Sequence, residues 1–456
     1  MDRKFSFLAM VSVLAIATPA AAQDDQQDQL LAELAQMRAQ MAEMAARIDH
    51  LQGELEAVEG EAAAAREEAQ SAETAVAAVV QASDATDIVF KGAPQITAEG
   101  GWSFKPRGRL QFDAGVVNSP DSTGRSDGFG SEARRIRLGV AGDIPGGFGY
   151  KFEADFAGND LSVTDAIISY ETGNVEILVG QQNTFQGLEE LTSSLHTSFI
   201  ERSAFTDAFN FERRVGVSAI VETGDVLLQG GVFSDNAEDL SNQNWSLDGR
   251  AVFAPKLGDT QLHFGGSVHF ADLETGSTVR FRQRPLVHFT SERFINTDFF
   301  DANSEFGVGL ESAAIAGPFH VSAEAFWQSV DVPFTTMDPT FFGGSIEAGY
   351  FLTDGDSRGY KGGKFDRVKP NNPVGEGGAG SVQVNVRYDH LDLTDAGIIG
   401  GTQNGYMVSI VWKPTDYTLL LANYGRLEYD DAVFPLADGS TSYGVDAFGV
   451  RAQIDF

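Results

Sequence analysis

From 134 to 181 the chain alternates apolar and polar residues with a period of two, the spacing of a β-strand with one apolar face. Four such runs follow one another, separated by turn signals rich in Gly, Asn and Pro. One face of these runs carries full charges, and the other is apolar and aromatic. The pattern therefore predicts four consecutive antiparallel strands.

The alternation continues to the last residue, Phe456, which lies on an apolar strand face. A soluble β-sandwich also alternates and is the alternative to a barrel. A charged face opposite an uninterrupted apolar face, repeated over hundreds of residues, favours a transmembrane antiparallel β-barrel with lipid outside and water inside. We predict sixteen strands from about seventeen candidates, because bacterial barrels have even strand numbers. The candidates are five between 104 and 179, then 215–221, 226–232, 246–253, 261–271, 279–287, 305–314, 319–328, 343–352, 381–391, 405–413, 418–428 and 443–456.

The first 101 residues of the chain have a different pattern. Residues 1–22 have a basic start, a short apolar core and small residues at the end, which predicts a secretory signal peptide. Apolar residues then recur in steps of four and three from Leu30 to Val58, and this spacing predicts an α-helical coiled coil over 23–83. A lone amphipathic helix is the alternative. Residues 84–101 are expected to be a linker, and 102–456 to be the barrel.

Composition agrees with an exported β protein. The 456 residues include 50 Gly for turns, 34 Phe for strand faces and no Cys, so a disulfide scaffold and a Cys-based metal site are excluded. No later segment has the roughly 20 continuous apolar residues of a membrane helix. Any membrane insertion must therefore use strands.

Charged residues repeat on the polar faces of the first strands. Three cations follow one another on the first strand, and arginines on the second extend the row. Arginine suits an anion path because it stays charged and offers several donors. The alternative for each arginine is a salt bridge on the lumen wall with Glu153, Asp155 or Asp165. The predicted pore-lining residues are Lys105, Arg107, Arg109, Arg135, Arg137, Lys151, Glu153 and Asp155. A second triplet on one face of a candidate strand is Arg280, Arg282 and Arg284.

Alternation fails between 181 and 214, a stretch too long for a hairpin turn. Such a loop in a barrel folds into the lumen and narrows it, whereas the alternative is an ordinary surface loop. The predicted constriction residues are Glu189, Glu190, Glu201, Arg202, Arg213 and Arg214.

Enzyme classes find little support. The histidines are scattered except for His263 and His269, whose shared face favours lumen lining, and neither a phosphate-binding glycine loop nor a nucleophile elbow occurs. A hydrolase whose catalytic set assembles only in the folded barrel is the remaining enzyme alternative. We predict a protein that is not an enzyme, with no cofactor and no metal site.

Several stretches together resemble the phosphate-selective porin O/P family of bacterial outer membranes. In order they are RRIRLGVAGD, VGQQNTFQGLEELTSS followed by IERSAF, FRQRPLVHFTSERFINTDFF, GPFHVSAEAFW, YFLTDGDSRGYKGGKFDRVKP, RYDHLDLTD and VWKPTDYTLLLANYGRLEYDD. They span 102–456, and the coiled coil lies outside the resemblance.

The resemblance implies a homotrimer of 16-stranded barrels, each with its own pore, an inward loop and basic residues that guide anions. Relatives that select anions place lysines at the constriction, but 181–214 contains none, and the barrel region is acidic overall. The expected function is a water-filled channel for small hydrophilic solutes, with anions favoured and phosphate among them. The alternative is a general or cation-preferring porin whose coiled coil also tethers the outer membrane to peptidoglycan.

The expected location is the bacterial outer membrane, with the N-terminal segment in the periplasm. Expected partners are outer-membrane lipid and lipopolysaccharide, further copies of the chain, peptidoglycan and small anionic solutes. Nucleic acid is not an expected partner.

Overall fold

The structure is a computed structural model that describes residues 23–456 except 82–85, 126, 159, 242 and 336. The predicted signal peptide, 1–22, lies outside the described residues. The chain divides into two compact units, 1–84 and 85–456. The second unit contains the barrel strands.

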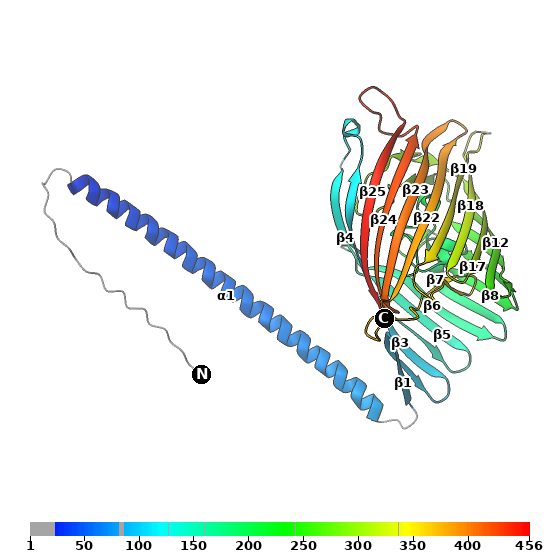
Figure 1. Ribbon diagram of the computed structural model, residues 1–456, viewed down its shortest axis with the longest axis horizontal. Coiled ribbons are helices and arrows are strands. Elements are labelled where there is room, and N and C mark those ends of the chain that lie inside the picture. The colour runs from blue at the N-terminus through cyan, green and yellow to red at the C-terminus, as the bar shows by residue number, and fades with distance from the viewer. Residues whose placement is uncertain (1–22, 82–85, 126, 159, 242, 336) are drawn as a thin grey trace. The chain divides into compact units, whose positions relative to one another are not determined.

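The first unit contains the helix α1 (Gln23–Gln81), 59 residues long (Figure 1). Ala, Glu, Gln and Leu dominate its sequence, and these residues favour helix. A helix over most of 23–83 was expected, whereas its assembly into a coiled coil stays a prediction. Within the described residues, no helix is long and apolar enough to cross a membrane.

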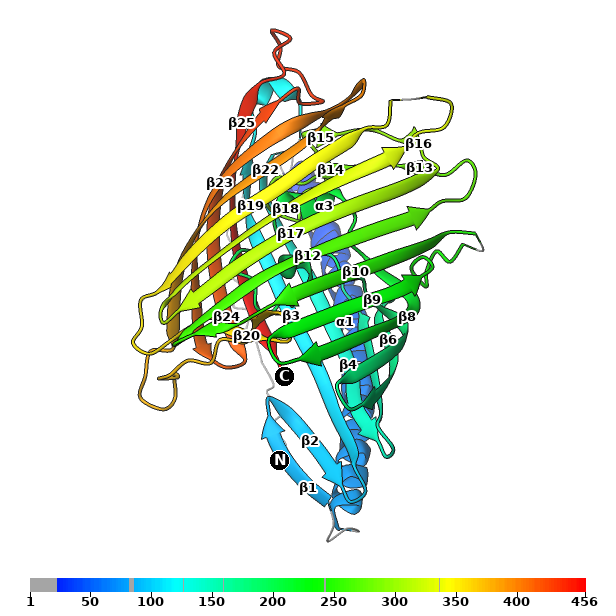
Figure 2. The ribbon, with the colours of Figure 1, turned by 90° about the vertical axis from the view of Figure 1, so that its right-hand side faces the viewer.

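Sixteen strands of the described chain form a closed antiparallel barrel, as predicted (Figure 2). Each strand pairs with the next along the chain, and the last pairs with the first to close the wall. The strands are β3 (Trp102–Asn118), β4 (Gly128–Ile144), β5 (Phe148–Asp155), β6 (Ser162–Thr172), β7 (Val175–Asn183), β8 (Arg213–Thr223), β9 (Val226–Phe233), β10 (Trp245–Phe253), β12 (Thr260–Asp272), β17 (Ser304–Ala316), β18 (Phe319–Asp331), β19 (Thr340–Phe351), β22 (Ser381–Asp395), β23 (Ile398–Thr415), β24 (Thr418–Asp430) and β25 (Tyr443–Asp455).

The two faces of each strand differ in the way that the sequence predicts. On β25, Phe448 and Ile454 are exposed on the outside, whereas Arg451 and Gln453 are buried on the inside. Successive strand side chains point to opposite faces, so a period of two gives an apolar outer wall and a polar inner wall.

The prediction of a barrel strand over 279–287 was wrong. This segment belongs to the connection between β12 and β17, which contains only the short strands β13 (Thr278–Val279), β14 (Arg282–Gln283), β15 (Ile295–Asn296) and β16 (Phe300–Asp301). Phe281 and Val287 are fully buried there, in an apolar cluster rather than on a lipid-facing wall. The segment alternates like a strand, but its apolar side chains are buried against residues from distant parts of the chain, so it does not join the barrel wall.

The prediction of a linker over 84–101 is also corrected. It contains a hairpin of β1 (Thr86–Lys91) and β2 (Ala93–Ala98), and β2 pairs with the start of β3. Gly92 makes the turn with a φ of 82°, and a Cβ there would lie 2.6 Å from the Tyr417 ring. The hairpin thus extends the sheet beyond the barrel wall.

Connections fold into the barrel and divide its interior. The loop 184–212, called the constriction loop below, contains α2 (Leu188–Leu191) and α3 (Ala204–Ala208), and Figure 2 shows α3 inside the wall. Another connection forms the hairpin of β20 (Gly359–Lys361) and β21 (Lys364–Asp366). The remaining short elements are β11 (Lys256–Leu257) and the 3₁₀ turn η1 (Asp121–Thr123).

An apolar cluster fills part of the lumen. Phe199 and Phe205 of the constriction loop pack with Phe281 and with wall residues such as Leu391 and Val445. These wall residues lie on β22 and β25, so apolar packing closes this side of the interior. The open space must therefore lie elsewhere in the lumen.

Candidate functional site

A cavity of about 640 Å³ lies in the lumen between the constriction loop and the wall. We call it the lumen cavity. Its cationic side chains number eleven, and they are Arg107, Arg109, Arg134, Arg135, Arg137, Lys151, Arg202, Arg213, Arg284, Lys364 and Arg367. Its five carboxylates are Asp165, Glu190, Glu201, Asp207 and Asp366. Positive charge is therefore in excess around this space.

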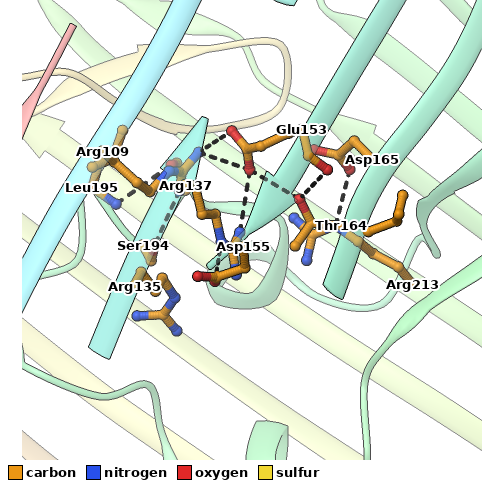
Figure 3. Close-up of polar contacts among 12 residues, drawn as sticks. Arg109, Arg135, Arg137, Glu153, Asp155, Thr164, Asp165, Ser194, Leu195 and Arg213 are labelled. Carbon is orange, nitrogen blue, oxygen red and sulfur yellow. Dashed lines mark hydrogen bonds and ion pairs between the residues drawn. The ribbon is translucent and has the colours of Figure 1, made fainter. Parts of the chain in front are cut away.

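Two shared carboxylates organise the wall formed by β3 to β6 (Figure 3). Glu153 lies 3.0 Å from Arg109 and 3.3 Å from Arg137, which also bonds Asp155 at 2.6 Å. The ion pairs expected as the alternative role of these arginines are thus present. Since Arg109 and Arg137 share Glu153, pairing holds the guanidinium groups in place without making the cluster acidic.

Asp165 on β6 has the same arrangement. Lys151 lies 2.7 Å from one of its oxygens, and Arg213 at the start of β8 lies 2.9 Å from the other. Asp165 is buried, so this one carboxylate joins three strands through two cations. The row of charges predicted from β3 and β4 therefore extends to β8.

Other cations of the cavity have no carboxylate partner. Arg135 is buried and donates to the side-chain oxygen of Gln111 at 3.0 Å. Among the described residues, no ion pair joins Arg107, Arg135 or Lys364 to a carboxylate. Arg107 and Lys364 are exposed in the lumen, and Arg135, although buried, lines the same cavity.

Glu201 is the acidic residue of the constriction loop with the most cationic contacts. It bonds Arg134 at 2.7 Å and lies 3.3 Å from Arg451. Burial raises the pKa of Glu201, but Arg134 and Arg135 beside it outweigh burial and hold that pKa well below its ordinary value. The carboxylate is thus ionised at neutral pH and offsets part of the nearby positive charge.

The other residues predicted for the constriction have different places. Glu190 pairs with Arg202 at 3.3 Å, and both line the lumen cavity. Glu189 does not line it, because its carboxylate bonds the wall residue Arg387 instead. Arg214 pairs with Asp235 at 3.4 Å and lines a second cavity of about 350 Å³.

The predicted pore-lining set is also only partly assembled at the cavity. Arg107, Arg109, Arg135, Arg137 and Lys151 line it, whereas Glu153 and Asp155 support these cations from behind. Lys105 lies apart, because its Nζ donates to the carbonyl of Lys91 at 3.1 Å.

The second arginine triplet lies on the loop between β12 and β17. Arg284 lines the lumen cavity, 3.9 Å from Asp207, whereas Arg280 and Arg282 line the second cavity. Burial and the neighbouring Arg284 lower the pKa of Arg293 on the same loop to about 10. Arg293 therefore still carries its charge at neutral pH, beside the triplet.

The two histidines expected to line the lumen are buried on one face of β12. His263 contacts the Tyr360 hydroxyl at 2.6 Å, and His269 contacts Asp248 at 2.9 Å. Both have partners on other elements, which suits a role in fixing the wall.

Comparison with known proteins places this geometry in a family. Residues 104–456 match the family described as phosphate-selective porin O and P. The chain belongs to this family. It is also 46% identical to an uncharacterized protein of Caulobacter vibrioides over 389 residues, which cover 82% of this chain and 78% of that protein.

Solved structures of low sequence identity share the fold. In vitro folded OmpT of Vibrio cholerae, in its trimer form, has a TM-score of 0.51 at 12% identity and covers 78% of this chain and 100% of its own. The outer membrane channel DcaP of Acinetobacter baumannii has a TM-score of 0.50 at 14% identity, with 79% and 99% covered. The protein is thus a porin of the bacterial outer membrane, and membrane lipid surrounds its barrel.

Several charged residues of this porin escaped the sequence analysis. Arg134 has the opposite strand parity to Arg135, but a bulge opposite Gln111 and Phe112 shifts the register there, and Arg134 reaches Glu201. Lys364 and Arg367 lie far along the chain, around a short hairpin. The bulge and the inward fold of the hairpin leave no periodic signal in the sequence.

Lys364 gives the porin an expected dependence on alkaline pH. The side chain of Lys364 is exposed in the lumen, but the surrounding protein atoms and the positive charges of Lys151 and Arg250 lower its pKa. Deprotonation removes a positive charge, so anion preference should weaken as pH rises toward the ordinary lysine pKa of about 10.4. The variant Lys364→Arg keeps its charge over this range. Reversal potentials measured from neutral to alkaline pH should therefore fall for the wild type and fall less for K364R, and equal curves would assign the dependence to other groups.

Proposed function

We propose that this porin passes small hydrophilic anions in preference to cations, phosphate among them, by passive diffusion. The observation that carries the proposal is the lumen cavity, where cationic side chains outnumber carboxylates. A narrow aqueous path lined by one sign of charge concentrates counter-ions and excludes ions of the same sign. We also propose that transport uses no catalytic step, cofactor or metal ion.

The direct test is the reversal potential of the purified porin in a planar bilayer under a potassium chloride gradient. We expect a sign that indicates chloride as the more permeant ion. Added phosphate should then reduce the chloride current, because a multivalent oxyanion binds the same guanidinium groups more strongly. A cation-selective potential without phosphate block would contradict the proposal.

That opposite result would favour a general or cation-preferring porin. This alternative function is supported by the acidic character of the chain, which has a net charge of −33, and by Glu190 and Glu201 in the constriction loop. In the structure these two carboxylates pair with Arg202 and Arg134, so they are largely neutralised. The arrangement supports the anion-preferring function over its alternative.

We further propose that the chain is a homotrimer whose N-terminal helices associate as a periplasmic coiled coil. Eight apolar side chains on α1 are between 45% and 60% exposed in the single chain, and they recur in steps of four and three. They are Leu34, Met37, Met41, Met44, Ile48, Leu51, Leu55 and Val58. Such a seam is buried when helices pair. The trimer form of the similar OmpT structure is in line with this assembly.

A helix of this length also suits a link to peptidoglycan, while the outer end of the barrel would contact lipopolysaccharide. Deletion of residues 23–86 should leave single-channel conductance unchanged, because the cavity is built from the barrel unit alone. It should weaken retention of the outer membrane on isolated cell walls and lower trimer stability. Unchanged retention would exclude the link, and unchanged trimer stability would exclude the coiled coil.

A further inference from the structure

The constriction loop is bonded through its backbone to carboxylates on the barrel wall. Glu324 lies on the lumen side of β18, and its two oxygens accept the backbone N–H groups of Leu188 and Glu189, each at 2.8 Å. Gly187 precedes them with a φ of 85°, and a Cβ there would lie 2.8 Å from the same carboxylate. The close approach of the loop to Glu324 therefore needs glycine at 187.

A second attachment lies on β22. Asp389 accepts the backbone N–H of Ala204 at 2.8 Å. Arg387, on the same face, bonds the Glu189 carboxylate at 2.5 Å and the Glu201 carbonyl at 3.2 Å. The loop is thus attached near both of its short helices.

The two attachments are also tied to each other. The second oxygen of Glu189 accepts the backbone N–H of Ser203 at 3.0 Å and its hydroxyl at 2.6 Å. Arg387 is held in turn by Glu347 of β19 at 3.0 Å. Three wall strands, β18, β19 and β22, therefore fix the loop as one unit.

The other side of the loop lines the lumen cavity, through residues such as Glu190, Ser194 and Glu201. Any release of the loop from β18 and β22 would change the shape of this space. We propose that Glu324 and Asp389 are positioning residues that hold the constriction loop and so set the cross section of the pore. The proposal rests on the proposed function, because it takes the lumen cavity as the solute path.

Physical chemistry indicates what each change at Glu324 would do. The buried carboxyl group of Glu324 accepts two backbone N–H groups, and the loss of either bond leaves a buried donor unsatisfied. The Glu324→Gln side chain has the same size but only one acceptor oxygen, and its NH₂ group would face a backbone donor. Removing one such bond raises the population of the displaced loop roughly tenfold. The current should then fluctuate between levels.

The test compares single-channel recordings of the full-length wild type, E324Q and the matched control E311Q. Glu311, on β17, pairs with Arg250 at 2.6 Å and lies 3.6 Å from His263, and neither residue belongs to the constriction loop. Both variants replace a buried carboxyl group by an amide in neighbouring parts of the wall. We expect frequent partial closures in E324Q. In E311Q we expect steady currents close to the wild type, with lower stability instead, because Arg250 loses its buried ion-pair partner.

A second variant keeps every charge. Gly187→Ala adds a methyl group against the Glu324 carboxylate at a backbone φ that disfavours alanine. It should produce the same closures as E324Q with an unchanged reversal potential. If E324Q does not yield folded trimers, the same recordings are made with G187A and Asp389→Asn, and we expect partial closures in both.

The outcomes separate this proposal from the proposed function. The wild-type reversal potential tests anion preference, whereas the closures test the attachment of the loop. Steady wild-type currents in folded E324Q and G187A would overturn the positioning role, even if the pore prefers anions. Closures in both variants of a pore that prefers cations would support the positioning role and reject the proposed function.

Discussion

Replacement of Arg135 by glutamine is expected to lower the anion-to-cation permeability ratio roughly 30-fold. Arg135 lines the lumen cavity and has Gln111 rather than a carboxylate as its hydrogen-bond partner. A unit charge about 4 Å from an ion contributes about 1 kcal/mol even in bulk water, and its loss weakens both the attraction of anions and the repulsion of cations, about 2 kcal/mol in the ratio. Glutamine keeps hydrogen-bonding capacity, so the change removes mainly charge. The reversal potential under a salt gradient measures the ratio.

The matched control is Arg426→Gln. Arg426 lies on the outer face of β24, where it pairs with Glu428 at 2.6 Å and Asp446 at 2.8 Å. This variant changes the total charge equally but outside the lumen, and we expect an unchanged reversal potential. Equal shifts in the two variants would mean that total charge, rather than the lumen cavity, controls selectivity.

The variant Asp113→Ala is expected to cost about 3–5 kcal/mol of the free energy of unfolding, the typical cost of removing one partner of a buried ion pair. Asp113 on β3 accepts two bonds from Arg451 on β25, at 2.7 Å and 2.6 Å, and both side chains are buried. These residues lie opposite each other in the strand pair that closes the barrel. Unfolding by denaturant in detergent measures the loss.

The double variant D113L/R451M distinguishes loss of the pair from loss of packing. Two apolar residues of similar volume often replace a buried ion pair without loss of stability. Glu201, the other partner of Arg451, would still have Arg134. We therefore expect the double variant to be clearly more stable than D113A. If both variants lose the same free energy of unfolding, the ion pair is not what stabilises the contact between β3 and β25.

The sequence alone predicts the architecture of the wall. A period of two places charged side chains such as Arg109 and Glu153 on one face and the aromatic residues on the other, and a water-filled barrel in lipid satisfies both faces. The strand pattern also predicts a closed barrel of sixteen strands and an inward loop between β7 and β8. Those features follow from the local pattern along each strand, together with the even strand number of bacterial barrels.

The position of each charge within the lumen is decided only by tertiary structure. Glu189 and Glu201 look equivalent in the sequence, yet Glu189 bonds Arg387 on the wall while Glu201 lines the cavity beside Arg134. Lys364 reaches the cavity from a hairpin far along the chain. The segment 279–287 has the alternation of a strand but is buried inside the barrel. Such outcomes depend on contacts between residues that barrel closure and loop folding bring together, and a short stretch of sequence contains no record of them.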